Sequence, residues 1–293
     1  MVATVLQLTL SGVATGCVYG LVAIGFVLIY KATETVNFAQ GELMMLGAFL
    51  GYTLVVLAGL PWWLGLVMSL MLMALLGAAM ETVLLRPVLG QSALTVVMVT
   101  IGFGFVARGV TSMIPAWGDE THRLPTPFAD QTVSLGGVAL SIEQGAVIVL
   151  TALLCGVLYV FFRFTRIGVA MQAISQNQLA AYYMGIPVRR INTFIWALSA
   201  GVAAFAGILL APVTFVHPNM GLIGLKAFPA AVVGGFDSLP GAIIGGMIIG
   251  LVESYAGFFL PEGFKDVAAY AVVLLMLMLR PHGLFGGQLR KKV

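Results

Sequence analysis

Long apolar runs separated by short polar stretches occupy almost the whole chain. They lie at about 5–30, 40–60, 64–85, 93–114, 140–162, 191–213, 241–260 and 265–280. Most of them approach the roughly 20 apolar residues that a membrane-spanning helix needs. A shorter run at 221–236, between Pro218 and Pro240, indicates a short or bent crossing, which is tolerated only where it is buried or lines a cavity. The pattern therefore predicts an all-α, polytopic helical membrane protein with about eight to nine spans, some of them broken.

Composition supports this class. Of 293 residues, 60% are hydrophobic and 9% are charged, whereas a soluble domain carries about 25% charged residues. No polar stretch is long enough for a separate soluble domain, so we expect a single transmembrane domain over 1–293. The two cysteines, Cys17 and Cys155, fall within expected spans and indicate no disulfide framework. The formal charge of +3 comes from basic residues at the ends of the runs, and it does not indicate a nucleic-acid partner.

The positions of the basic residues predict the orientation. They bracket the polar stretch 163–190 and end the chain, as Arg163, Arg166, Arg189, Arg190, Arg280, Arg290, Lys291 and Lys292. Because cytoplasmic loops carry an excess of Lys and Arg, we expect the 163–190 stretch and the C-terminus to be cytoplasmic. The parity of the crossings then places the N-terminus on the periplasmic side.

The stretch 163–190 is polar but patterned. Its central part, 172–181, predicts a short helix outside the bilayer. Gly185 can supply a left-handed end to this helix, and Pro187 fits the first turn of the next span. An apolar-faced helix between two spans indicates a docking surface for a soluble partner. The alternative is an ordinary connector, although such connectors are usually shorter and less patterned.

The second apolar run begins with four polar or helix-breaking residues, which are Asn37, Gln40, Gly41 and Glu42. A carboxylate within a span is costly and normally faces a cavity or a partner. This stretch therefore predicts a discontinuous helix that lines a pathway. The alternative is an interfacial helix start, with Asn37 as its cap.

Other charged residues have more ordinary interpretations. We expect Glu81 to pair with Arg86 or to extend towards the membrane surface, and Arg108 to reach the lipid headgroups. Glu253 indicates a packed, hydrogen-bonded residue. The loop 115–137 is the longest polar stretch, and we expect it to be solvated outside the membrane.

Glycines at helical spacing occur in two of the apolar runs. They are Gly12, Gly16 and Gly20 in the first run, and Gly241, Gly245, Gly246 and Gly250 in a later one. Small residues at this spacing let two helices approach closely, so both runs are expected to pack tightly against neighbours.

Motifs for catalysis are missing from the sequence. There is no G-x-x-x-x-G-K-[ST] phosphate loop, so we expect no ATP hydrolysis by this chain and no cofactor within it. Three histidines lie near the ends of segments, and no H-E-x-x-H motif or cysteine cluster is present. The sequence therefore predicts neither catalytic residues nor a metal site.

Three stretches, at 16–49, 168–207 and 226–253, together resemble the permease subunits of bacterial branched-chain amino-acid ABC importers. They carry V-N-F-A-Q-G-E at 36–42, A-A-F-A-G at 203–207 and S-L-P-G-A at 238–242. The resemblance covers nearly the whole chain, and its most specific part is the first stretch.

The resemblance implies a subunit of the bacterial inner membrane. Its expected partners are a second related permease, two cytoplasmic ATPases that bind ATP and magnesium, and a periplasmic binding protein that delivers branched-chain or other small amino acids. It also implies that 168–186 holds a coupling helix, with contacts from Ala173, Ser175, Gln176, Asn177, Ala180, Ala181, Met184 and Gly185. Related importers often carry an acidic residue there, and this chain has Ser175 to Gln178 instead, so we expect docking through apolar contacts and hydrogen bonds.

The candidate residues for the pathway or its gate are Asn37, Gln40, Gly41, Glu42, Lys226, Asp237 and Ser238. Two alternatives remain open: a related importer of urea or short amides, and an autonomous ion-coupled carrier. A carrier would not need a partner-docking helix in the 163–190 stretch.

Overall fold

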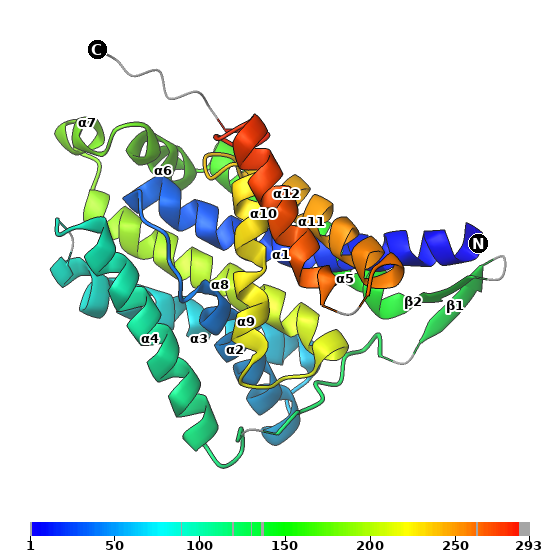
Figure 1. Cartoon of the computed structure of the whole chain (residues 1–293). Helices are drawn as coiled ribbons and strands as arrows, with labels where there is room; N and C mark the ends of the chain where they lie inside the picture. Colours follow the sequence, from blue (N-terminus) through cyan, green and yellow to red (C-terminus); the bar gives the residue numbers. More distant parts are fainter. Residues whose placement is uncertain are drawn as a thin grey trace.

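The computed structural model describes residues 2–88, 90–118, 120–129, 131–135, 138–261 and 263–286 (Figure 1). Its helices are α1 Val2–Thr33, α2 Gln40–Tyr52, α3 Trp62–Ala79, α4 Ala93–Met113, α5 Ile142–Phe164, α6 Arg166–Gln176, α7 Gln178–Tyr183, α8 Val188–Thr214, α9 Met220–Leu225, α10 Ala227–Gly234, α11 Leu239–Phe259 and α12 Phe264–Leu279. Short π-helical turns follow α2 at Thr53–Leu57 and α3 at Met80–Leu85, and a 3₁₀ turn covers Arg86–Val88.

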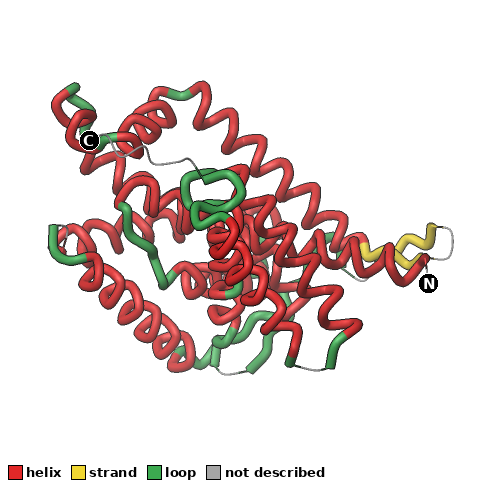
Figure 2. The backbone as a smooth tube through the Cα atoms, turned by 45° about the horizontal axis from the view of Figure 1, so that its top comes forward, coloured by secondary structure: helices red, strands yellow, loops and turns green. Residues whose placement is uncertain are grey.

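Seven helices within the described ranges are long and apolar enough to cross a membrane. Two shorter apolar segments, Met220–Gly234 and Val267–Leu279, follow the expected short crossing and the expected last span. The predicted class, a polytopic helical membrane protein, is therefore confirmed. Figure 2 shows that the strands of the described chain form one small hairpin, β1 Thr132–Leu135 with β2 Val138–Ser141, which the apolar pattern of the sequence does not predict.

Helix α1 forms the centre of the bundle and packs along α11 and α8. The glycines of α1 and α11 face each other: a Cβ on Gly16 would lie 2.7 Å from the Met247 Cα, and one on Gly246 would overlap the backbone of Gly20. Neither helix can carry a larger side chain at these points, so the predicted tight packing of both glycine series is confirmed.

Helix α8 packs against α3 and α2 to form a second layer. A Cβ on Gly77 of α3 would lie 2.5 Å from the Trp196 carbonyl oxygen, and one on Gly47 of α2 would overlap Ala204. Trp196 itself is almost fully buried. The backbones of α3 and α2 therefore touch α8 directly.

The run 221–236 is a broken helix, as predicted. Helices α9 and α10 meet at Lys226, and a Cβ on Gly224 of α9 would overlap Gly41 of α2. Helix α10 ends at Gly234. The next residue, Gly235, has a φ of 99°, a conformation that glycine adopts at little cost. The amides of Leu284 and Phe285 then donate to the last carbonyls of α10, at 2.9 and 3.1 Å, so the chain beyond α12 caps α10.

The 163–190 stretch contains two short helices, α6 and α7, instead of the single helix predicted at 172–181. The break lies at Asn177, which has an extended backbone and accepts a hydrogen bond from the Ala180 amide at 2.9 Å. This side chain competes with helix continuation, because Asn offers the backbone an alternative partner. Gly185 has a φ of 81° and ends the segment as expected, and Pro187 immediately precedes α8 instead of lying within its first turn.

The loop between α4 and α5 is partly packed, so the prediction of a merely solvated loop is wrong for Trp117, His122 and Leu124. His122 exchanges backbone hydrogen bonds with Val216, and its ring stacks on Tyr52 at 4.5 Å between centroids. The Trp117 ring stacks on Phe49, and Leu124 is buried. These aromatic contacts fix the loop across the ends of α2 and α8.

Figure 1 shows α6, α7 and the end of α12 at the upper side of the molecule, and the start of α1 beside β1 and β2 at the right. The described ends of the chain thus lie far apart. The basic residues Arg290, Lys291 and Lys292 lie outside the described residues.

Candidate functional site

A buried cluster of amides joins the start of α2 to the middle of α8. Asn37 and Gln40 have no exposed surface. The Asn37 Nδ2 donates to Gln40 Oε1 at 3.2 Å, and the Gln40 Nε2 donates to the Ser199 carbonyl at 3.4 Å. Asn37 Oδ1 also accepts from the Ala39 amide at 3.1 Å, so Asn37 shapes the turn that precedes α2.

Ser199 completes this cluster from α8. Its hydroxyl lies 3.0 Å from the Gly25 carbonyl and 3.2 Å from Gln40 Oε1. A Cβ on Gly25 would overlap the Gln40 amide nitrogen, so the glycine in α1 makes room for the amide. Ser199 carries no signal in the sequence, because its partners are distant along the chain.

Glu42 of α2 forms an ion pair with Arg108 of α4, with 2.7 Å between Oε1 and Nη2. The Glu42 side chain is 8% exposed and the Arg108 side chain is 25% exposed. Gly221 and Gly104 lie close around the pair, since a Cβ on either would approach Glu42 to 3.2 Å. The prediction that Arg108 reaches the lipid headgroups is wrong, because a carboxylate within the bundle offers it a closer partner.

A second buried carboxylate, Glu253 of α11, gathers three partners. The Tyr19 hydroxyl donates to its Oε2 at 2.6 Å, and the Nζ atoms of Lys226 and Lys265 each lie 3.5 Å from its Oε1. Lys226 comes from the junction of α9 and α10. The broken helix therefore places Lys226 beside the buried Glu253 carboxylate. Glu253 is the packed, hydrogen-bonded residue that the sequence predicts.

The remaining candidates lie elsewhere. Ser238 caps α11 by accepting a hydrogen bond from the Gly241 amide at 3.0 Å. Asp237 and Ser238 line a cavity between α1, α5 and α11, and Asn37, Gln40 and Glu42 are not part of its wall. The structure thus divides the predicted pathway residues into three regions: the start of α2, the Glu253 cluster with Lys226, and this cavity with Asp237 and Ser238. Their role in transport stays a prediction.

The described part of the coupling segment, α6 and α7, presents an apolar surface. Leu179, Tyr182, Tyr183 and Met184 are exposed, whereas Ala181 is buried against the bundle. Of the other expected contact residues, Gln176, Asn177, Ala180 and Gly185 are exposed, and Ala173 and Ser175 are half-buried. A large apolar patch rimmed by polar residues is typical of a protein interface.

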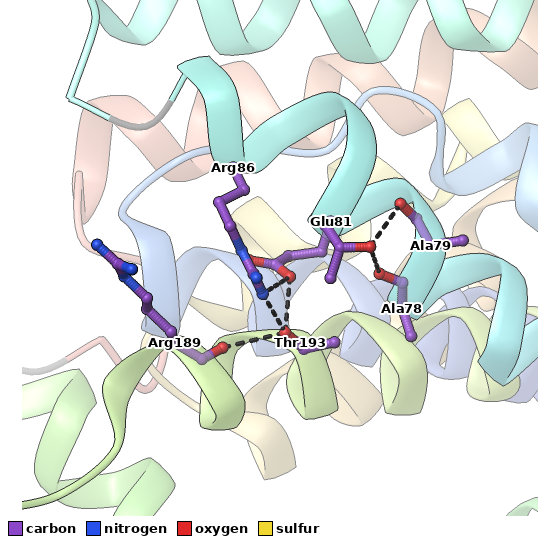
Figure 3. A network of polar contacts seen from close by, with 7 residues as sticks. Ala78, Ala79, Glu81, Arg86, Arg189 and Thr193 are labelled. Atoms are coloured by element: carbon purple, nitrogen blue, oxygen red, sulfur yellow. Dashed lines mark hydrogen bonds and ion pairs between the residues drawn. The ribbon is translucent and has the colours of Figure 1, made fainter.

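The start of α8, directly after this segment, is tied to the helical turns that follow α3 by a polar network (Figure 3). The predicted pair of Glu81 and Arg86 is confirmed at 2.8 Å between Oε2 and Nη2. Thr193 of α8 joins it: its hydroxyl donates to Glu81 Oε2 at 2.7 Å and accepts from Arg86 Nη2 at 2.8 Å. The Thr193 hydroxyl also lies 3.0 Å from the Arg189 carbonyl. Thr193 was missed because a threonine in an apolar run carries no sequence signal of its own.

Within the described residues, no group of three His, Cys, Asp or Glu side chains is placed to hold a metal ion. Several charged and amide side chains within the bundle are paired between helices, such as Glu42 with Arg108 and Gln40 with Ser199. Polar clusters in such a bundle are typical of membrane transport proteins, where they mark substrate and ion pathways. The architecture therefore defines a multi-pass membrane protein of the transporter class.

The chain belongs to the family described as the permease component of branched-chain amino acid transport systems, whose family model matches residues 8–279. It is 31% identical to the high-affinity branched-chain amino acid transport system permease protein LivH of Escherichia coli (strain K12), over 96% of this chain and 95% of LivH. It is also 31% identical to the corresponding permease protein BraD of Pseudomonas aeruginosa, with the same coverage. The resemblance to this family is thereby confirmed.

A solved structure shares the fold. The chain aligns with PsaBC from Streptococcus pneumoniae in complex with Fab at a TM-score of 0.51, covering 97% of this chain and 98% of that chain. The sequence identity is 16%. At this identity the likeness extends to the arrangement of the helices and to nothing finer.

Proposed function

We propose that this chain forms the translocation pathway of an ATP-driven importer for branched-chain or other small amino acids, delivered by a periplasmic binding protein. Family membership and the named relatives support the substrate class. The observation on which the ATP-driven mechanism rests is the exposed apolar surface of α6 and α7, since an autonomous carrier would leave that surface without a partner.

The proposed assembly contains a second related permease and two cytoplasmic ATPases, which bind and hydrolyse ATP with magnesium. This chain contributes neither catalytic residues nor a cofactor. It lies in the bacterial inner membrane, with α6, α7 and the C-terminus in the cytoplasm and the N-terminus in the periplasm. The bracketing arginines of the 163–190 stretch support this orientation.

The proposed mechanism uses α8 as the transmitting element. ATP-driven closure of the ATPases displaces α6 and α7. Because α8 begins directly after Pro187, it is displaced with them. Thr193 passes this displacement to α3 through Glu81 and Arg86. Ser199, six residues further along α8, passes it to α1 and α2 through Gly25 and Gln40. The broken helix α9–α10 packs on α2 at Gly41, so Lys226 at its junction moves with the pathway residues at the start of α2.

A pull-down of the tagged chain in mild detergent tests the coupling surface. Ala180→Glu and Met184→Glu each place a charge on the exposed apolar patch, and we expect both to release the ATPase subunits. Gln91→Glu is the matched control, because Gln91 is exposed in the connection between α3 and α4, outside the coupling segment. Retention of the ATPases by both patch variants would reject this docking surface.

Uptake measurements separate the alternatives. Right-side-out vesicles with the binding protein should accumulate leucine or a related amino acid only when ATP is supplied inside. Uptake of urea or acetamide in place of amino acids would assign the chain to an importer of short amides. Uptake driven by an ion gradient without ATP would identify an autonomous carrier.

A further inference from the structure

A cavity of about 720 Å³ lies between α1, α5 and α11, and Gln172 of α6 lines one end of it. One of its walls is α5, whose outer face exposes Val149, Leu153 and Val160. The cavity therefore adjoins a surface suited to lipid hydrocarbon, and it lies apart from the buried clusters around Gln40 and Glu42.

The cavity is polar at one end and apolar along its length. Lys31, Arg163 and Gln172 line the end near α6, whereas Ile24 and Cys155 line the other end. Arg163 and Cys155 are eight residues apart on α5, which corresponds to about 12 Å along the helix axis at 1.5 Å per residue. A ligand that fills this space needs a polar group at one end and an aliphatic chain at the other.

The polar end carries an excess of positive charge. Arg163 donates to the Tyr159 hydroxyl and stacks over the Tyr159 and Phe164 rings, at 5.7 and 5.9 Å from their centroids. No carboxylate of the described residues forms an ion pair with Arg163. Lys31 and Asp237 both line the cavity, so Asp237 offsets one of its two cations.

We propose that this cavity binds an anionic phospholipid, with the phosphate between Lys31 and Arg163 and one acyl chain along Ile24 and Cys155. Basic pockets between membrane helices on the cytoplasmic side suit such headgroups. Because α6 covers the polar end, the bound lipid contacts the segment to which we assign coupling. This inference goes beyond the proposed function, and its test does not depend on substrate or ATPases.

Native mass spectrometry of the full chain, purified in mild detergent, measures the lipid retained. The probes are phosphatidylglycerol, phosphatidylethanolamine and phosphatidylcholine, added at equal concentration. We expect phosphatidylglycerol to be retained about fivefold better than either other lipid, as one excess basic charge near an anionic lipid predicts.

Two variants test the two ends of the cavity separately. Lys31→Gln with Arg163→Gln removes the cations, and Gly156→Leu fills the apolar part, where an added Cβ meets no atom within 4 Å. Both should abolish the preference. The matched controls are Arg166→Gln, an exposed arginine outside the cavity wall, and Gly145→Leu, on the same helix and equally open. Both controls should retain it.

Equal retention of the three lipids by the unmodified chain would overturn the proposal. So would an unchanged preference for phosphatidylglycerol in Gly156→Leu and in the double charge variant, because the lipid would then bind elsewhere. Loss of the preference in both controls as well would also overturn it, since the effect would then belong to the protein surface in general.

Discussion

Glu42 and Arg108 are 66 positions apart in the sequence, and their side chains meet at 2.7 Å between α2 and α4. The pair links the helix that begins with the amide cluster to a helix that is otherwise only loosely attached to the bundle, at the left of Figure 1. Since α4 has few buried residues, we infer that this ion pair has a large share in holding it.

Breaking the pair should therefore lower both stability and uptake. Glu42→Gln leaves Arg108 without its carboxylate, and the loss of one partner of a buried pair is costly. A double-mutant cycle with Arg108→Gln should give a coupling energy of about 1–3 kcal/mol, read from thermal or denaturant unfolding in detergent. Additive effects of the two single changes would show that the pair is not coupled. Unchanged uptake in Glu42→Gln would remove Glu42 from the pathway candidates.

The amide cluster gives a steric prediction. Gly25→Ala forces a methyl group against the Gln40 amide, and overpacking of this kind costs about 1–3 kcal/mol. We expect a lower melting temperature. Adding Gln40→Ala should recover part of the loss, because the smaller side chain frees the space. If the double variant is less stable than Gly25→Ala alone, the overlap is not the cause of the loss.

The interface of α1 and α11 gives a second steric prediction. Gly246→Ala brings a methyl group onto the backbone of Gly20, and neither main chain can yield without separating the helices. The folded yield and the melting temperature should both fall. Gly102→Ala in α4 is the control, since a Cβ there meets no atom within 4 Å. Equal melting temperatures of the two variants would contradict the close packing.

Thr193→Val tests transmission from α8 to α3. Valine keeps the volume of threonine but removes the hydroxyl that bonds Glu81 and Arg86. We expect the assembled importer to retain its basal ATPase rate while amino-acid uptake per ATP falls several-fold. Thr82→Val is the matched control, because among the described residues the Thr82 hydroxyl bonds only the nearby carbonyls of Ala78 and Ala79. A parallel loss of ATPase and uptake in Thr193→Val would indicate a structural defect instead.

Single-cysteine labelling tests the orientation. In a chain carrying Cys17→Ala and Cys155→Ala, an impermeant maleimide added to intact cells should label Thr132→Cys. It should label Gln91→Cys only after the membrane is opened. The reverse result would invert the proposed topology.

Local features of the sequence were sufficient for much of the fold. The apolar runs predicted the helices, since a helix in lipid must bury its own backbone polar groups. The spacing of Gly16 and Gly20 predicted a close helix contact, and the break around Lys226 followed from the short run at 221–236. In the same way, Glu81 and Arg86 are near enough in sequence for their pairing to be expected.

The sequence alone therefore determined the class of protein, its family and the positions of nearly all its helices, because these depend on hydropathy and local spacing. Only the tertiary structure decided which polar groups meet. Arg108 pairs with Glu42, Ser199 with Gln40 and Thr193 with Glu81, each across helices that are distant in the chain. A buried polar group must find a partner, but which partner it finds depends on how the helices pack.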